Sequence, residues 1–218
     1  MAVAPITDAM EDYLKIIYKL QQRRGSASTS EVAARMHVSP PSATSMIKRL
    51  ARQRLIVHTP YHGLVLAPAG ERIALETIRH HRLLELYLAQ SLGISLDRVD
   101  GEAERLEHVL SDDVEARISA TLGDPTRDPH GDPIPAKDGT VRDVRYPNLT
   151  QVPVGDAGVV DRVSDGRPEV LRRLASLGML PGVAVRVLAR LAGRRLRVEL
   201  GGHELVLPRD LAEGVYVR

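Results

Sequence analysis

Carboxylates and an imidazole recur at helical spacing near the middle of the chain. Glu104, Glu107 and His108 are spaced i, i+3 and i+4, which predicts that their side chains share one face of a helix. Asp12, in the first helical stretch, can complete the set. Carboxylates that are brought together repel one another, and a divalent cation relieves that repulsion. The pattern therefore predicts a cation site.

A second pair of the same kind lies on the preceding helical stretch. His81 and Glu85 are four residues apart and face the same way on a helix. A single Glu–His pair is most simply the solvated face of a charged helix. Five such candidates on two adjacent helices favour metal binding instead, although the solvated-face interpretation stays open.

The composition limits which metal such a site can hold. The 218 residues include 8 His but no Cys, Trp or Phe, so thiolate ligands, disulfides and a Cys nucleophile are excluded. Carboxylate, imidazole and water donors favour Mn²⁺ or Fe²⁺ over Cu(I) or a structural zinc. The longest stretch without Asp, Glu, Lys or Arg is residues 55–70, and residues 1–8 do not resemble a signal peptide. We therefore expect a soluble, cytoplasmic protein.

Charge is distributed unevenly along the chain. The net charge is only +2, yet residues 1–75 carry +5, residues 76–123 carry −5 and residues 124–218 carry +2. This asymmetry predicts a polyanion partner for the first segment and a cation for the second.

The elements that must position these residues begin with a helix–turn–helix. Apolar periodicity over residues 10–20 predicts a first helix, and Ser28 with Glu31 forms a capping-box sequence for a second. A third helix follows Pro40 and Pro41. Two β-prone runs on either side of residues 60–63 predict a hairpin, which completes a winged helix over residues 1–72.

The rest of the chain predicts three further parts. Helical patterns fill residues 73–123, where an apolar stretch from Ile73 to Leu88 is either a dimer interface or a buried core helix. Residues 124–153 are rich in Pro, Asp and Gly, which favours a linker over a packed element. Residues 154–218 alternate like half-buried strands around one helix. The predicted fold is mainly α with small β parts: a winged helix-turn-helix, a helical domain that carries the candidate metal ligands, and a small C-terminal β-barrel.

Several of these segments together resemble the diphtheria-toxin-repressor and manganese-transport-regulator (DtxR/MntR) family of metal-dependent repressors, over nearly the whole chain. The C-terminal part is similar to the SH3-like domain of the three-domain members and of ferrous-transport accessory (FeoA-like) proteins. The segments that carry the resemblance are Met10–Leu14 with Ile17–Tyr18, Val38–Thr44, His81–Glu85, Glu104–Asp112, Asp128–Pro135 and Leu177–Gly182.

The resemblance implies a ligand set for the metal. The family's primary site matches Asp12, Glu104, Glu107 and His108. The iron branch usually has Met and Cys where this chain has Asp12 and Glu104, so oxygen in place of sulfur favours Mn²⁺, with Fe²⁺ as the alternative. The manganese branch often has a second carboxylate where this chain has Lys15. In an ancillary site, His81 and Glu85 would match the family's ligands, and Asp100 stands where the family usually has a His. The family also draws ligands from the C-terminal domain, where Glu169 is the nearest carboxylate in this chain.

The third helix is the predicted recognition helix. Small polar residues and a proline would face base edges in the major groove, and basic residues would hold phosphates. The expected base-facing residues are Ser39, Pro41, Ser42 and Ser45. The expected backbone contacts are Lys48, Arg49 and Arg52, with Tyr61 at the tip of the wing.

These features predict a homodimeric, metal-dependent DNA-binding regulator, most simply a repressor, that controls manganese or iron homeostasis and is not an enzyme. Mn²⁺ would link the DNA-binding and dimerisation domains and set the spacing of two recognition helices on double-stranded operator DNA. Two alternatives remain open: a winged-helix regulator that metal does not gate, and a di-metal carboxylate enzyme, for which the chain lacks a second Glu-x-x-His helix pair.

Overall fold

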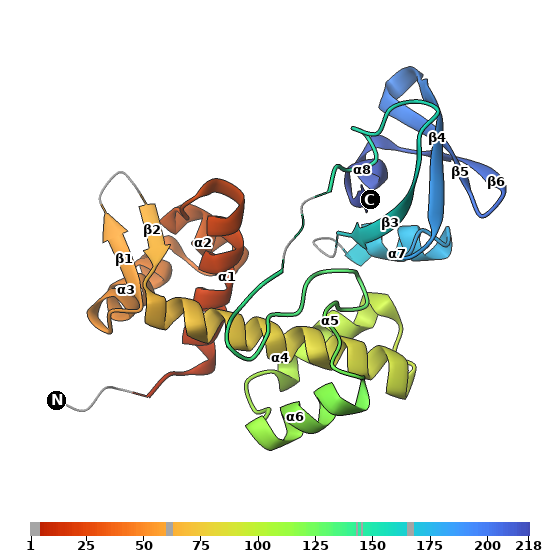
Figure 1. Cartoon of the computed structure of the whole chain (residues 1–218). Helices are drawn as coiled ribbons and strands as arrows, with labels where there is room; N and C mark the ends of the chain where they lie inside the picture. The colour runs from red at the N-terminus through yellow and green to blue at the C-terminus, as the bar shows by residue number, and fades with distance from the viewer. Residues whose placement is uncertain (1–4, 60–62, 143, 145, 165–167) are drawn as a thin grey trace. The chain divides into compact units, whose positions relative to one another are not determined.

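The computed structural model describes residues 5–59, 63–142, 144, 146–164 and 168–218 (Figure 1). These residues form two compact units. The first unit comprises the chain up to His81 together with Leu106–Leu110 and Pro135–Thr140. The second unit comprises Arg82–Arg105, Ser111–Ile134 and Val141–Arg218.

The first unit contains the predicted winged helix. The third helix begins with two prolines, which suit the first helical turn because their missing N–H groups would be unpaired there anyway. The capping box forms as expected, with the Ser28 hydroxyl accepting from the Glu31 amide. The wing tip, including Tyr61, lies outside the described residues. The elements are α1 (Asp8–Arg24), α2 (Thr29–Arg35), α3 (Pro40–Arg52), β1 (Ile56–Thr59) and β2 (Gly63–Leu66).

One apolar core holds these elements together. β1 and β2 pair antiparallel, and Ala27 adds a bridge to Leu64. The inward faces of α1 and α3 supply fully buried side chains, including Leu14, Ile17 and Leu50. This core fixes the first turns of α1, on which Asp12 and Lys15 lie.

Three helices follow: α4 (Pro68–Leu92), α5 (Leu96–Leu106) and α6 (Asp112–Thr121). The sequence predicted that the helix over residues 96–110 would carry Glu107 and His108, but α5 ends at Leu106 and the next three residues form a turn. The prediction of one shared helical face is therefore wrong for these two residues. In this turn the Glu107 carbonyl oxygen lies 3.1 Å from Nδ1 of His80, a partner that replaces the amide a continued helix would supply.

The apolar residues of α4 are mostly buried within this single chain, as the core-helix alternative predicted. Ile78, Leu83 and Leu84 are at most 4% exposed. These residues are not available as an open dimer face, and the homodimer stays a prediction on the structure alone. Among the described residues, none of the helices combines the length and the apolar character needed to cross a bilayer.

Part of the predicted linker is packed, contrary to expectation. A bridge between Arg127 and Pro133 closes a turn whose central residues Asp128 and His130 are buried. Gly131 adopts φ +93°, and a Cβ there would lie 2.2 Å from the Asp161 carbonyl oxygen. The sequence showed a turn composition, but only the close approach of a distant strand makes the turn part of the packed structure.

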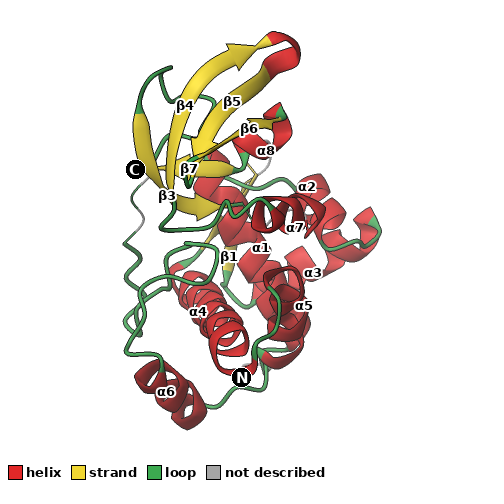
Figure 2. Ribbon diagram, turned by 90° about the vertical axis from the view of Figure 1, so that its right-hand side faces the viewer, coloured by secondary structure: helices red, strands yellow, loops and turns green. Residues whose placement is uncertain are grey.

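The C-terminal segment forms a curved five-stranded antiparallel sheet in the order β6-β5-β4-β3-β7, with α8 beside it (Figure 2). Its core joins the inward faces of the strands to Leu171 and Leu174 of α7. The predicted strands and helix are present; the sequence missed α8 and β7, which are short. The elements are β3 (Ala157–Val163), α7 (Pro168–Ser176), β4 (Ala184–Leu191), β5 (Arg195–Leu200), β6 (His203–Leu207), α8 (Arg209–Glu213) and β7 (Val215–Val217).

Candidate metal centre and DNA-binding face

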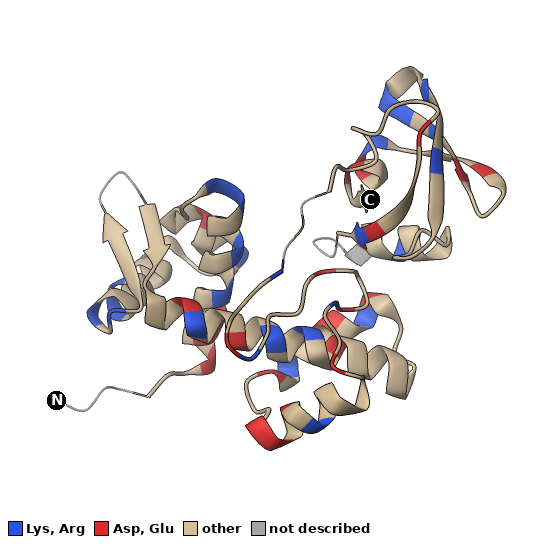
Figure 3. Ribbon diagram, viewed as in Figure 1, with Lys and Arg blue, Asp and Glu red and all other residues tan. Residues whose placement is uncertain are grey.

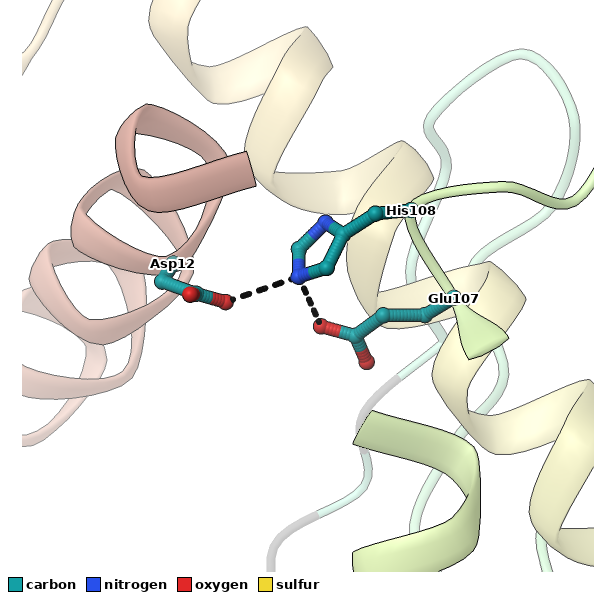
Figure 4. Close-up of side chains that lie close together, drawn as sticks. All are labelled: Asp12, Glu107 and His108. Carbon is teal, nitrogen blue, oxygen red and sulfur yellow. Dashed lines mark ion pairs between the residues drawn. The ribbon is translucent and has the colours of Figure 1, made fainter. Parts of the chain in front are cut away.

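Residues from α1, α4 and the turn after α5 converge inside the first unit. We call this set, consisting of Asp12, Lys15, His81, Glu107 and His108, the Asp12 cluster. Ligand atoms of Asp12, Glu107 and His108 lie within 4.8 Å of one another (Figure 4). Two residues far apart in sequence from Asp12 are thus brought to the helix that begins the winged helix.

His108 stands between the two carboxylates. Its Nε2 lies 3.1 Å from Asp12 Oδ1 and 3.4 Å from Glu107 Oε1 (Figure 4). Its Nδ1 lies 2.6 Å from Glu11 Oε2. A carboxylate on Nδ1 orients the ring and directs Nε2 at the other two groups. The ring is therefore held in position to offer Nε2 as a ligand.

Glu107 is the most enclosed member of the cluster. The residue is 1% exposed, and its two carboxylate oxygens face different partners. Oε2 lies 2.5 Å from His81 Nδ1, while Oε1 contacts the Lys15 ammonium. Lys15 is itself buried, and its Nζ lies 3.8 Å from Asp12 Oδ1.

The surroundings shift the pKa values of both Glu107 and His108. Burial acts to raise the pKa of Glu107, but the hydrogen bond and charge of His81 and the charge of Lys15 outweigh it, so its pKa lies below the ordinary value. Burial acts to lower the pKa of His108, but the hydrogen bond to Glu11 and the charges of Asp12 and Glu107 raise it above the ordinary value. The cluster therefore favours an ionised carboxylate beside a positive group.

The donor set suits a hard or borderline divalent cation. Two carboxylates and one imidazole, without sulfur, are typical ligands for Mn²⁺ and Fe²⁺. The sulfur of Met10, two residues before Asp12, belongs to a side chain fully buried in the apolar core. Asp12 retains a side-chain exposure of 26%, which leaves the cluster open to ions from solvent.

The remaining predicted ligands lie in the second unit. Glu104 is exposed on α5, and Glu169 is exposed at the start of α7. Carboxylate oxygens of Glu85 and Asp100 lie within 4.8 Å of each other. Their roles stay predictions.

The second unit also holds a buried group that the sequence did not predict. We call Arg82, Glu85, Asp128, His130 and Asp132 the Asp128 cluster. Nε2 of His130, which is fully buried, lies 3.3 Å from Glu85 Oε1. The signal was present in Asp128-Pro-His-Gly131, a turn sequence in which an Asp side chain can bond amides two and four residues on.

Asp128 is bound by the backbone and by arginine. Its Oδ1 accepts from the amides of His130 and Asp132, both at 2.9 Å, and its Oδ2 lies 3.4 Å from Arg82 Nε. Burial, followed by the charges of Asp132 and Glu85, raises the pKa of Asp128 to about 8. Asp132 is in turn 3.0 Å from a guanidinium nitrogen of Arg162 on β3.

The exposed face of α3 carries the predicted DNA contacts. Pro41, Ser45, Lys48 and Arg52 are exposed at helical spacing, on the side opposite the buried residues of α3. Basic side chains gather toward the C-terminal end of this helix (Figure 3). The Ser39 hydroxyl caps α3 by accepting from the Ser42 amide, and Ser39 and Ser42 are both exposed at the helix start, while Arg49 is partly exposed.

Three family descriptions match successive parts of the chain. Residues 5–64 match "Iron dependent repressor, N-terminal DNA binding domain", and residues 67–136 match "Iron dependent repressor, metal binding and dimerisation domain". Residues 148–218 match "FeoA domain". The matches cover the winged helix, the helices after it and the C-terminal sheet in turn.

Individual relatives match over almost the full length. The iron-dependent repressor IdeR of Mycobacterium tuberculosis (strain ATCC 25618 / H37Rv) is 31% identical, with 97% of each chain covered. The diphtheria toxin repressor of Corynebacterium diphtheriae is 35% identical over 61% of this chain and 59% of its own length. A solved manganese-dependent transcriptional repressor in complex with manganese superposes with a TM-score of 0.89 at 41% identity, covering 96% of this chain and 99% of that one. A winged helix, a carboxylate–histidine cluster attached to its first helix and these full-length matches together show that the chain belongs to the DtxR/MntR family of metal-dependent transcriptional repressors.

Proposed function

We propose that this protein is a manganese-responsive repressor in which Asp12, Glu107 and His108 hold the regulatory ion. One observation carries the proposal: a residue of α1 and two residues from the turn after α5 place ligand atoms within 4.8 Å of one another. An ion bound by all three would attach that turn to the first helix of the DNA-binding fold. Glu104 is the fourth ligand that the family resemblance implies.

The donor chemistry favours manganese over iron. The cluster offers carboxylate oxygen and imidazole nitrogen but no sulfur, and the chain contains no Cys. The similarity is also higher to a manganese-dependent repressor, at 41% identity, than to the iron-dependent repressors of Mycobacterium, at 30–31%. Control of manganese homeostasis follows from this choice of ion.

The DNA-binding part of the proposal rests on α3. Its exposed hydroxyls and Pro41 suit base edges in the major groove, and Lys48, Arg49 and Arg52 suit phosphates. A family member of this kind acts as a homodimer on an operator with two half-sites, one turn of DNA or a multiple of it apart. The ion would favour the arrangement of the chain that matches this spacing, and DNA would tighten ion binding by the same factor.

Binding to DNA with and without metal tests the proposal. The probe is a duplex selected from a random-sequence pool by the Mn²⁺-loaded wild-type protein, and fluorescence anisotropy reports its affinity. Asp12→Asn should lose most of the Mn²⁺-stimulated affinity, whereas the matched control Asp8→Asn, one turn earlier on α1, should retain it. Equal Mn²⁺ stimulation in both variants would show that metal does not act through this cluster.

A comparison of ions completes the test. Mn²⁺ should stimulate DNA binding at lower free concentration than Fe²⁺ or Zn²⁺. DNA binding by the wild type that is equally tight in a chelator would instead support a winged-helix regulator that metal does not gate.

An ancillary ion in the second unit is a further part of the proposal. Glu85 and Asp100 place carboxylate oxygens within 4.8 Å of each other, and His130 Nε2 lies 3.3 Å from Glu85. His81 is another ligand that the family resemblance implies, and Glu169 is the nearest carboxylate in the part of the chain from which the family draws its further ligands. Metal counting by mass spectrometry on the wild type and Glu85→Gln would detect such an ion as a loss of one per chain.

A further inference from the structure

The Asp12 cluster contains a cation of its own. Lys15 lies one turn after Asp12 on α1, and its side chain is only 6% exposed. A lysine is seldom buried to this degree unless its charge is paired. Here the ammonium contacts Glu107 Oε1 and lies 3.8 Å from Asp12 Oδ1.

These two oxygens are also the ones that face the candidate ligand His108. Nε2 of His108 is 3.1 Å from Asp12 Oδ1 and 3.4 Å from Glu107 Oε1. A divalent ion bound by Asp12, Glu107 and His108 would therefore contact the same two carboxylate oxygens that face the ammonium of Lys15. One cation is attached to the chain, and the other comes from solution.

This sharing has two physical consequences. Without metal, the ammonium balances two carboxylates that would otherwise repel each other in a poorly solvated place. With metal, a positive charge remains within a few ångströms of the ion and opposes both its binding and the entry of a second ion.

We propose that Lys15 is a tethered cation that stabilises the metal-free Asp12 cluster, sets a lower affinity for the regulatory ion and restricts the cluster to one ion. The inference rests on the proposed function, because it assumes that Asp12 and Glu107 bind a divalent ion. It adds a residue that tunes the metal concentration at which the protein responds.

Neutral replacements of Lys15 test the effect on affinity. Lys15→Met and Lys15→Gln should bind Mn²⁺ about tenfold more tightly by isothermal titration, since a like charge has been removed from the immediate surroundings of the ion. The same variants should melt at a lower temperature than wild type without metal and should gain more from added Mn²⁺. Lys19→Met, one turn further along α1 and partly exposed, is the matched control and should change none of these values.

A charge reversal tests the effect on ion number. Lys15→Glu should bind one more Mn²⁺ per chain than wild type. Lys15→Arg should keep the wild-type count and affinity.

The outcomes separate this inference from the proposed function. Unchanged or weaker Mn²⁺ affinity in both neutral variants, or an unchanged ion count in Lys15→Glu, would overturn the role of Lys15 while leaving an Asp12-dependent Mn²⁺ site in the wild type intact. Loss of metal-free stability with no change in affinity would mean that Lys15 is only a structural ion pair. A wild type whose Mn²⁺ binding does not depend on Asp12 would overturn the proposed function itself.

Discussion

The Asp12 cluster and the Asp128 cluster contain similar residue types but differ in what those residues contact. Each buries carboxylates beside histidine and one long basic side chain. The members of the Asp12 cluster contact one another through their side chains, and the side chain of Asp12 remains 26% exposed. In the Asp128 cluster the central carboxylate accepts two backbone amides and its side chain is only 2% exposed.

The difference shows what each cluster is suited to do. A carboxylate bound by amides of its own turn fixes the course of the chain, and the turn exists whether or not an ion arrives. Carboxylates that meet only other side chains can exchange one cation for another. The Asp12 cluster also includes a residue of the DNA-binding fold, whereas no residue of the Asp128 cluster belongs to α1, α2 or α3.

Histidine replacements should separate the two clusters most strongly. His108→Ala removes the ring that faces Asp12 and Glu107, and we expect about a 100-fold loss of Mn²⁺-stimulated DNA affinity. His130→Ala should keep that stimulation and lower the melting temperature instead, because a fully buried side chain is lost. Anisotropy and thermal denaturation on both variants measure this. A comparable loss of Mn²⁺ stimulation in His130→Ala would show that the Asp128 cluster also takes part in the response to metal.

The turn of the Asp128 cluster should be intolerant of a single methyl group. Gly131→Ala would place Cβ 2.2 Å from the Asp161 carbonyl oxygen at φ +93°, and we expect about 2.5 kcal/mol of destabilisation. Gly123→Ala is the control, because Gly123 also has a positive φ of 74° but no atom lies within 4 Å of the added Cβ. That variant should lose only about 1 kcal/mol. Urea denaturation measures the free energy of unfolding of both variants. Equal losses would show that the close approach of Asp161 to Gly131 does not contribute to the destabilisation.

pH should change Mn²⁺ affinity through the Asp12 cluster and folding stability through both clusters. The pKa of His108 is raised, so its protonated form stabilises the metal-free protein at low pH and this contribution is lost as pH rises through that pKa. Since a metal needs the neutral ring, Mn²⁺ affinity should rise with pH over the same range, by up to about tenfold per pH unit. Titration calorimetry between pH 5.5 and 8 measures the slope.

In the Asp128 cluster a raised pKa likewise lowers folding stability as pH rises. The pKa of Asp128 is raised to about 8, so the protonated form is favoured by folding, and its stabilising contribution falls as pH rises toward 8. Asp128→Asn cannot ionise, yet its amide oxygen can still accept both backbone amides. The fall in melting temperature with pH should therefore be smaller in this variant than in wild type, and an identical fall would contradict the assignment to Asp128.

The sequence predicted those helices and strands well whose boundaries depend on residues within or next to the element. The capping box of α2, the prolines that begin α3 and the strand alternation of β5 all lie within a few residues of what they determine. The structure also places Asp12, Glu107 and His108 side by side, while their role as metal ligands stays a prediction.

The failures share one physical cause, which is contact between residues distant in sequence. In the turn after α5, the Glu107 carbonyl oxygen pairs with the ring of His80, 27 residues earlier. The packed turn at Gly131 depends on the backbone of Asp161. The pairing of Lys15 with Glu107 joins residues 92 positions apart, so spacing along α1 revealed the lysine but not its partner.

The smallest expected effect concerns the DNA-binding face and tests whether the Asp12 cluster acts apart from it. Lys48 is exposed on α3, so Lys48→Ala should weaken DNA binding only several-fold and reduce the slope of log affinity against log salt by about 0.9 per protomer. The ratio of affinities with and without Mn²⁺ should stay at the wild-type value, because the variant removes a phosphate contact and no ligand. Anisotropy over a salt series, with Lys19→Ala as the control, measures slope and ratio together. A changed ratio would mean that the ion alters how α3 itself contacts DNA. The Asp12 cluster would then affect the recognition helix directly, as well as the arrangement of the chain around it.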